Sequence, residues 1–217
     1  MTASPLTVDL VSDIVCPWCY IGKRRLASAL QLLQDESPGR AVNVRWHPFQ
    51  LNPDLPSQGM DRRAYVEAKF GSREHADANY RRIRDVGETV GLDLRFDAIL
   101  RQPNTLDAHR VIAWAQSRPG HDVDALMEAL FAAYFTQGRF IGDRSVLSDV
   151  AAGTGIDRDA VAAMLESGHL ATDVATADER ARNMGIEGVP FFIFNGKVAL
   201  SGAHEPEALL QAIAQAG

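Results

Sequence analysis

Both cysteines of this 217-residue chain lie in one short run, Cys16-Pro17-Trp18-Cys19, between an apolar stretch and a helical pattern. A strand that ends in Cys-x-x-Cys and leads into a helix places the first sulfur among backbone N–H groups that have no partner within the helix. The positive end of the helix dipole favours the thiolate form of that cysteine. The run therefore predicts a site of thiol–disulfide exchange, built where a strand feeds directly into a helix.

The composition is that of an ordinary globular chain, 46% hydrophobic and 23% charged with a net charge of −6. This acidic balance argues against nucleic acid as a partner. Residues 1–15 lack a basic segment, and Asp9, Ser12 and Asp13 interrupt their apolar stretch. We therefore expect neither a signal peptide nor a membrane span, and a cytoplasmic protein. In a reducing cytosol the two cysteines favour reactivity or metal binding over a structural disulfide.

The first sixty residues predict a strand, a helix and a second strand. Their expected ranges are 7–15, 17–35 and 41–49. Val42, Val44 and Trp46 alternate with polar residues in the last range, as on one face of a strand. The helix between the two strands has the length of a crossover connection, so we expect the strands to pair in parallel.

From Asp61 to Gly185 the pattern becomes helical and is punctuated by glycine. The expected helices are 62–70, 74–90, 105–117, 122–137, 143–153, 157–166 and 170–184. Asp143 and Asp157 stand where a side-chain oxygen can cap a helix. Charges of alternating sign between Arg62 and Glu88 indicate a pair of helices that face solvent.

Strand character returns at 189–194 and 197–201, and the turn residues Asn195-Gly196 favour a two-residue hairpin between them. A helix at 205–216 follows. This order predicts an α/β protein with a thioredoxin fold and a large all-helical domain inserted after the first strand–helix–strand unit. We assign residues 1–60 and 186–217 to the thioredoxin-like domain and residues 61–185 to the helical insertion.

At this point the chain resembles the DsbA family of thiol–disulfide oxidoreductases over nearly its whole length. It is most similar to the FrnE-like branch, which is related to 2-hydroxychromene-2-carboxylate isomerases and kappa-class glutathione transferases. Four segments carry the resemblance: Asp13-Ile14-Val15-Cys16-Pro17-Trp18-Cys19, Trp46-His47-Pro48-Phe49-Gln50-Leu51-Asn52-Pro53, Asn104-Thr105 with Ala108-His109-Arg110, and Gly188-Val189-Pro190-Phe191-Phe192. The first and the last are the specific ones.

The resemblance implies a cis peptide bond between Val189 and Pro190, opposite the Cys16 sulfur. It leaves the backbone of Val189 available to an incoming substrate. Cys16, at the mouth of the helix, is the expected nucleophile, and Cys19, one turn further in, is the expected resolving thiol. Pro190 completes the catalytic set.

The surface that contacts substrate is expected to include Pro17, Trp18 and Val189. In related proteins the segment with Asn104 and His109 approaches the active cleft, which makes these two residues further candidates. Half of a zinc site is the alternative for the cysteines, but the six histidines show no metal-ligand spacing, so we expect no metal.

The expected substrates are protein or small-molecule thiols and disulfides, with no tightly bound cofactor and with glutathione admitted as a redox partner. A homodimer formed through the helical insertion is also admitted, because related proteins form one. Two other functions stay open. One is a glutathione-dependent isomerase or transferase, although such enzymes generally carry serine where Cys16 stands. The other is a chaperone-like module with an apolar groove lined by Phe131, Tyr134, Phe135 and Phe140.

Two side-chain roles also stay open. Asp13 is either a proton acceptor for the resolving cysteine or a cap of the following helix. The basic run Lys23-Arg24-Arg25 either adds positive potential near Cys16 or forms a solvated helix face.

Overall fold

The computed structural model describes residues 4–217, so the first three residues of the segment 1–60 lie outside the described part. The strands are β1 (Leu6–Ser12), β2 (Val42–Pro48), β3 (Met60–Asp61), β4 (Arg101–Gln102), β5 (Phe191–Phe194) and β6 (Val198–Ser201). The helices are α1 (Pro17–Glu36), α2 (Arg62–Phe70), α3 (Arg73–Glu88), α4 (Leu106–Gln116), α5 (Val123–Phe135), α6 (Arg144–Ala152), α7 (Arg158–Glu166), α8 (Ala171–Asn183) and α9 (Pro206–Ala216), with a short 3-10 helix at Phe96–Ala98. None of the helices in this described part is both long and apolar enough to cross a membrane.

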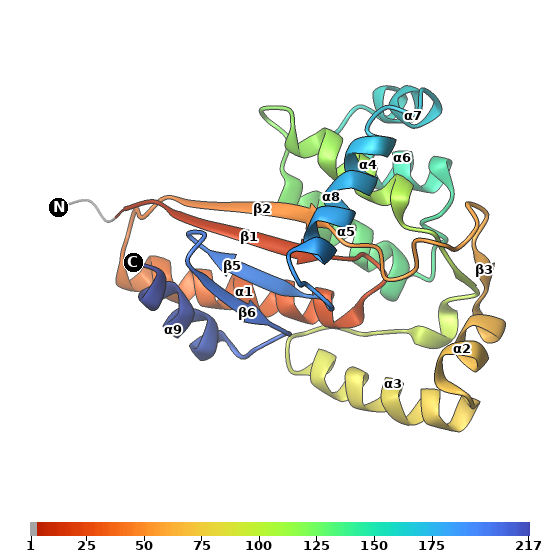
Figure 1. The fold of residues 1–217 in the computed structure, drawn as a ribbon, viewed down its shortest axis with the longest axis horizontal. Helices are drawn as coiled ribbons and strands as arrows, with labels where there is room; N and C mark the ends of the chain where they lie inside the picture. The colour runs from red at the N-terminus through yellow and green to blue at the C-terminus, as the bar shows by residue number, and fades with distance from the viewer. Residues whose placement is uncertain (1–3) are drawn as a thin grey trace.

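The four-stranded sheet has the order β2-β1-β5-β6 (Figure 1). β1 pairs in parallel with β2, as the connecting helix predicts, and antiparallel with β5. Asn195, Gly196 and Lys197 join β5 to β6, because Phe194 pairs with Val198. The hairpin loop therefore has three residues, one more than the sequence predicted, although Asn195 and Gly196 both have positive φ, 50° and 65°.

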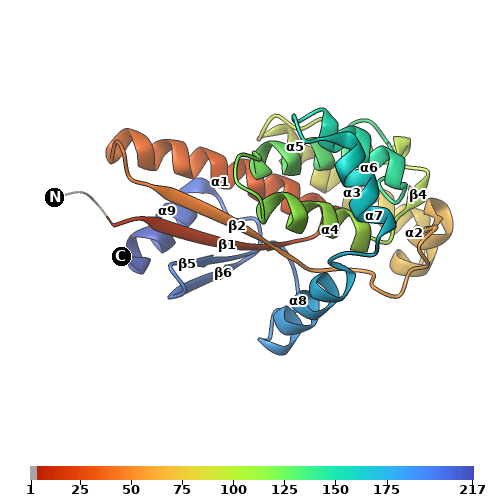
Figure 2. The same ribbon diagram turned by 90° about the horizontal axis from the view of Figure 1, so that it is seen from above.

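The two faces of the sheet are covered by different helices. Because side chains alternate along a strand, Leu10 and Val11 of β1 point to opposite faces. Leu10 packs in the main core with residues of α1, whereas Val11 packs with Ala181 of α8 in a smaller cluster. Figure 2 shows α1 and α8 on opposite sides of the strands.

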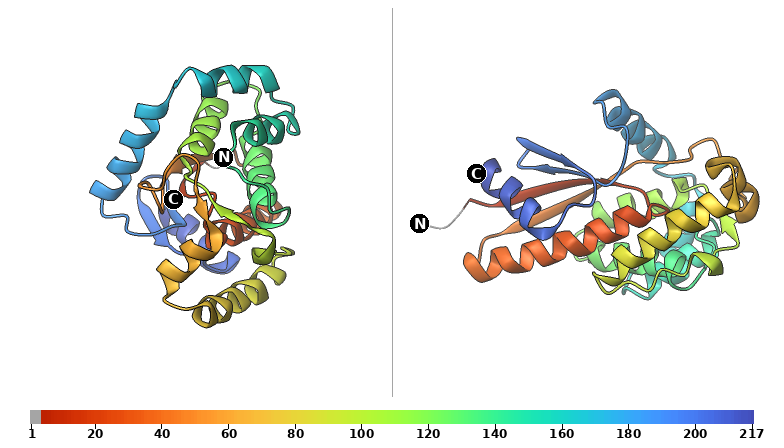
Figure 3. Two further views of the ribbon diagram at one scale, coloured as in Figure 1. Left: turned by 90° about the vertical axis from the view of Figure 1, so that its right-hand side faces the viewer. Right: turned by 90° about the horizontal axis from the view of Figure 1, so that it is seen from below.

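The segment between β2 and β5 is helical apart from β3 and β4, which pair antiparallel over two residues each. A pair this short leaves no alternating pattern in the sequence, which explains why it was not predicted. In the right view of Figure 3, the helices α2 to α7 gather at one end of the sheet. α8, the last helix of the segment, packs against both α4 and β2, and α4 also contacts β2. Asp143 and Asp157 cap α6 and α7 through their carboxylates, as predicted.

The basic run of α1 is neither a solvated face nor an unpaired cluster. Lys23 is buried and pairs with Asp124 and Glu128 of α5 at 2.9 and 3.1 Å. Arg25 is also buried, and it donates to the carbonyl of Ala203 before α9. The run therefore ties α1 to the helical segment on one side and to the C-terminal helix on the other.

Candidate active site

Cys16 stands at the N-cap of α1, with Pro17 in the first helical position. Its backbone is extended, and its side chain accepts no capping bond from the helix. The side chain is only 5% exposed. Its thiol donates a hydrogen bond to the carbonyl oxygen of Val189, at an Sγ–O distance of 3.5 Å. Pro17 suits this position because its missing N–H would have no partner there.

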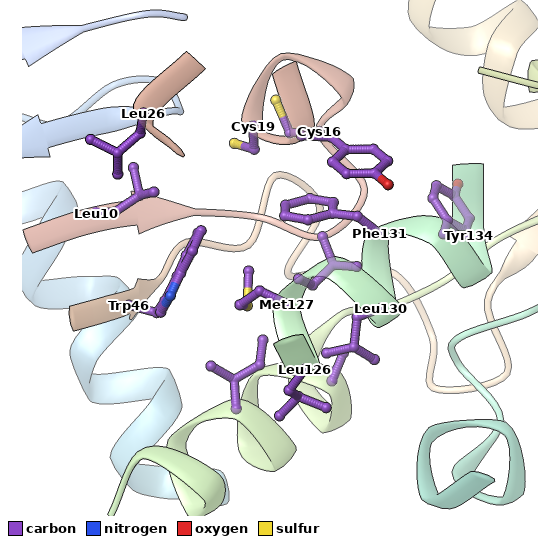
Figure 4. Packing of buried hydrophobic residues seen from close by; sticks show 14 of the residues in the cluster. Leu10, Cys16, Cys19, Leu26, Trp46, Leu126, Met127, Leu130, Phe131 and Tyr134 are labelled. Atoms are coloured by element: carbon purple, nitrogen blue, oxygen red, sulfur yellow. The ribbon is translucent and has the colours of Figure 1, made fainter. Parts of the chain in front are cut away.

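Cys19 lies one turn further along α1 and is fully buried. Burial raises the pKa of its thiol well above the ordinary value, and the neighbouring Cys16 sulfur raises it further. The Ser12 hydroxyl and the backbone of Asp13 act in the opposite direction on this pKa. Both cysteines are free thiols in the structure. Figure 4 shows them together at the start of α1, above Met127 and Phe131 of α5.

The peptide bond between Val189 and Pro190 is cis, and Pro190 is buried beside α1. Gly22 of α1 permits this close approach. A Cβ atom at Gly22 would lie 3.0 Å from Cγ of Pro190 and 3.2 Å from Cζ of Phe192. The first turns of α1 and the segment before β5 are thus fitted together directly around Cys16.

Asp13 is fully buried three residues before Cys16 and does not cap α1 with its side chain. One carboxylate oxygen accepts a hydrogen bond from the backbone N–H of Leu51 at 2.8 Å. The other lies 3.3 Å from Nε2 of His109, which α4 carries and which is itself buried. Of the two roles left open for Asp13, the cap of α1 is therefore wrong, and the carboxylate connects the active-site loop to the helical segment.

The substrate candidates from the sequence fall into two groups. Pro17, Trp18 and Val189 lie around Cys16 and are partly exposed. Asn104 does not reach this surface, because its amide donates to the carbonyls of Pro53 and Leu55 and so holds that loop. His109 is directed at Asp13, beneath the surface.

A cleft of about 200 Å³ opens beside Cys16. One wall comprises Cys16, Pro17 and Trp18. The other wall comes from α2 and α3 and includes Arg62, Tyr65, Lys69, Phe70 and Tyr80. The alternating charges of this segment predict helices that face solvent, so Arg62 and Lys69 were not predicted as residues of the site. Their helical pattern is the same whether a basic side chain faces bulk water or a cleft.

Three of the aromatic residues considered for a chaperone-like groove are buried in the main core. Phe131, Tyr134 and Phe135 are each at most 1% exposed, whereas Phe140 is half-buried. These side chains stabilise the interior and do not line an open groove. Across residues 4–217, no group of three His, Cys, Asp or Glu side chains is placed to hold a metal ion.

The chain matches the family model described as the DSBA-like thioredoxin domain over residues 7–214. Its sequence is 32% identical to that of a probable DsbA oxidoreductase from Streptomyces coelicolor, whose crystal structure it matches with a TM-score of 0.84. That match covers 97% of this chain and 89% of the other.

Two more distant structures share the fold. One is a 2-hydroxychromene-2-carboxylate isomerase, with a TM-score of 0.69 at 17% identity over 96% of this chain and 95% of the other. The second is the cytosolic disulfide reductase DsbM from Pseudomonas aeruginosa with GSH, with a TM-score of 0.63 at 18% identity over 96% and 94%. The fold expected from the sequence, with its helical insertion, is confirmed by these matches.

Proposed function

Because the chain belongs to the family of DSBA-like thioredoxin domains, we propose that it is a thiol–disulfide oxidoreductase in which Cys16 is the nucleophile and Cys19 the resolving thiol. The observation that carries this proposal is the placement of Cys16. Its sulfur stands at the N-terminus of α1, against the carbonyl of Val189 and beside a cleft. Cys19 lies behind it in the core.

The order of the chemical steps follows from the different positions of the two cysteines, Cys16 beside the cleft and Cys19 behind it. A Cys16 thiolate attacks one sulfur of a substrate disulfide, a mixed disulfide forms, and the other half leaves as a thiolate. Cys19 then gives up its proton and attacks Cys16 Sγ. This step closes the Cys16–Cys19 disulfide and releases the second half as a thiolate. Two electrons pass from the dithiol to the substrate, and the reverse sequence oxidises a dithiol.

The raised pKa of Cys19 keeps its thiol protonated before the second step, the attack of Cys19 on Cys16 Sγ. A buried thiol remains protonated while Cys16 waits for substrate, so the pair does not present two competing nucleophiles. Val189 and Pro190 form the surface opposite Cys16, and Pro17 and Trp18 form the surface around it. These residues are the proposed contacts of the substrate.

Thiols and disulfides are the proposed partners, and glutathione is a redox partner that the chemistry admits. The DsbM structure that shares this fold is described as cytosolic and contains GSH. A cytoplasmic site of action is therefore part of the proposal. Residues 61–185 form the proposed helical insertion, although α8 at its end packs on the sheet.

Trapping the mixed disulfide tests this proposal. Cys19→Ser should accumulate a stable adduct on Cys16 when it is mixed with an excess of oxidised glutathione and analysed by mass spectrometry. Cys16→Ser is the matched control and should form no adduct, because the remaining thiol, Cys19, is fully enclosed and does not line the cleft, whereas Cys16 does. A glutathione-dependent reaction that proceeds equally well without Cys19 would favour the isomerase alternative.

A further inference from the structure

The cleft beside Cys16 carries charge of one sign. Among residues 4–217, the charged side chains that line it are Arg62 and Lys69, and no aspartate or glutamate lines it. The adjoining groove, of about 340 Å³, differs in this respect, because four arginines and four carboxylates line it. The excess of positive charge is therefore specific to the cleft that contains Cys16, on a chain whose net charge is −6.

Arg62 is held in place by neutral acceptors. One of its terminal nitrogens donates to the side-chain oxygen of Gln102 and lies 3.5 Å from the hydroxyl of Tyr134. The other donates to the hydroxyl of Tyr80 at 2.7 Å. In the described chain no carboxylate forms an ion pair with Arg62, although its neighbour Arg63 pairs with Glu67. The positive charge of Arg62 is thus fixed in position and left without a counter-ion.

Lys69 lies seven residues after Arg62, about two turns further along the same face of α2. Its ammonium donates to the hydroxyl of Tyr65 at 2.9 Å and lies 5.4 Å from the centre of that ring. It too forms no ion pair with a carboxylate of residues 4–217. Two cations held by tyrosines, without acidic partners, form the receptor that a carboxylate or similar anion requires.

The other side chains that line the cleft are mostly aromatic or apolar, with Trp18, Phe70 and Phe96 among them, and the amides of Asn79 and Gln102 are neutral. Its volume of about 200 Å³ is smaller than the ~300–1,000 Å³ typical of ligand sites, so it admits a small molecule or one end of a larger one. We infer that the cleft selects low-molecular-weight disulfides and thiols that carry a negative charge on an apolar or aromatic body, with Arg62 and Lys69 as the residues that determine this specificity. This inference rests on the proposed function, because the bound molecule reacts with Cys16.

The reaction is the first exchange step described above. The cation pair holds the anionic group while the Cys16 thiolate attacks the nearer sulfur, the substrate S–S bond breaks, and one half leaves as a thiolate. The reduced protein supplies the two electrons. Arg62 and Lys69 take no part in bond making, so they should change the rate according to the charge of the substrate.

Single-turnover kinetics with two aromatic disulfides test this inference. The reduced protein is mixed with the dianionic 5,5′-dithiobis(2-nitrobenzoate) or with the neutral 4,4′-dithiodipyridine. Each rate is divided by the rate of dithiothreitol with the same disulfide. The anion-to-neutral ratio is the normalised rate with the dianionic disulfide divided by the normalised rate with the neutral one. This ratio should fall about tenfold in the double variant Arg62→Gln/Lys69→Gln, as expected when a charge-assisted contact is lost. The neutral disulfide should keep its rate within about twofold.

Two further variants keep the test decisive. Lys69→Gln alone changes an exposed side chain and should lower the ratio about threefold with the fold intact. Arg63→Gln is the matched control, because its exposed charge is already paired with Glu67 and should leave the ratio unchanged. Added sodium chloride should lower the ratio of the wild-type protein and have little effect on the double variant.

The outcomes separate this inference from the proposed function. If the ratio is the same in wild-type protein and in both cleft variants, the inference is overturned, while a normal rate with the neutral disulfide upholds the exchange chemistry. If neither disulfide reacts at Cys16, the proposed function itself fails.

Discussion

The thiol of Cys16 donates a hydrogen bond to the carbonyl oxygen of Val189, 3.5 Å away, although 173 positions separate the two residues in the sequence. The N-terminus of α1 and the segment before β5 are brought together because β1 and β5 are neighbours in the sheet. The nucleophile and the backbone that faces it are therefore positioned by sheet pairing, which is among the most rigid features of the fold.

The raised pKa of Cys19 predicts that its contribution to stability depends on pH. The folded state keeps the Cys19 proton to a higher pH than the unfolded state, in which a thiol ionises near pH 8.5. Stability from this group is therefore fully present below about pH 8.5 and is lost as the pH rises, by up to about 1.4 kcal/mol per pH unit. Urea unfolding of Cys16→Ser should show this loss, and Cys16→Ser/Cys19→Ala should not. Parallel curves for the two proteins would contradict it.

Glu128 is expected to stabilise the contact between α1 and α5. Burial opposes its ionisation, yet hydrogen bonds from Tyr20 and Lys23 hold its pKa below the ordinary value. The stabilisation is thus present above about pH 4.3 and is lost as the pH falls through the lowered pKa. Glu128→Gln should lower the free energy of unfolding by about 1–3 kcal/mol at pH 7, measured by chemical denaturation. The buried Lys23 then keeps its ion pair with Asp124, but a neutral glutamine replaces its second carboxylate partner. Asp124→Asn, at the exposed partner, should cost less, and equal losses would count against this account.

The two acceptor contacts of Asp13 predict a graded response. Asp13→Asn keeps an oxygen for the N–H of Leu51 and should lose little stability. Asp13→Ala leaves that partly buried N–H without its partner and should cost about 1–3 kcal/mol more in urea unfolding. Asp93→Ala, at an exposed site, controls for the loss of a carboxylate. If Asn and Ala destabilise equally, the contact with Leu51 is not what Asp13 contributes.

Gly22→Ala should destabilise the protein even though alanine favours a helix. The gain in helix propensity is about 1 kcal/mol, whereas crowding against Pro190 and Phe192 should cost about 1–3 kcal/mol. Ala27→Gly, at an exposed position of the same helix, measures the propensity term in this protein. If crowding is absent, Gly22→Ala should raise the thermal midpoint by as much as Ala27→Gly lowers it. That result would contradict the prediction.

Most of the fold could be predicted from local patterns. The turn at Asn195-Gly196 and the caps at Asp143 and Asp157 each depend on residues that are close in sequence. The expected end of the first strand at residue 15 is wrong, because β1 ends at Ser12 and residues 14 and 15 form a turn before α1. The pair β3–β4 could not be predicted, since two residues are too few to show an alternating pattern.

Part of the site could likewise be predicted from local sequence, and the rest depends on contacts between distant residues. The cysteine run predicts its own helix N-terminus, because the whole motif lies within four residues. The contact between Asp13 and His109 joins residues 96 positions apart, and no periodicity records it. Arg62 and Lys69 carry the alternating charges of an exposed helix, so only the packing of α2 near α1 reveals that they line a cleft.

The most direct test of the central claim is the redox equilibrium of Cys16 and Cys19. Purified protein is equilibrated in buffers of varied ratios of reduced to oxidised glutathione, and the free thiols are alkylated and counted by mass. We expect a reversible two-electron couple, with Cys16 the sulfur that is alkylated first in the reduced protein. If no disulfide forms between the two cysteines, or if a glutathione adduct on Cys16 is the stable end product, the dithiol mechanism is contradicted.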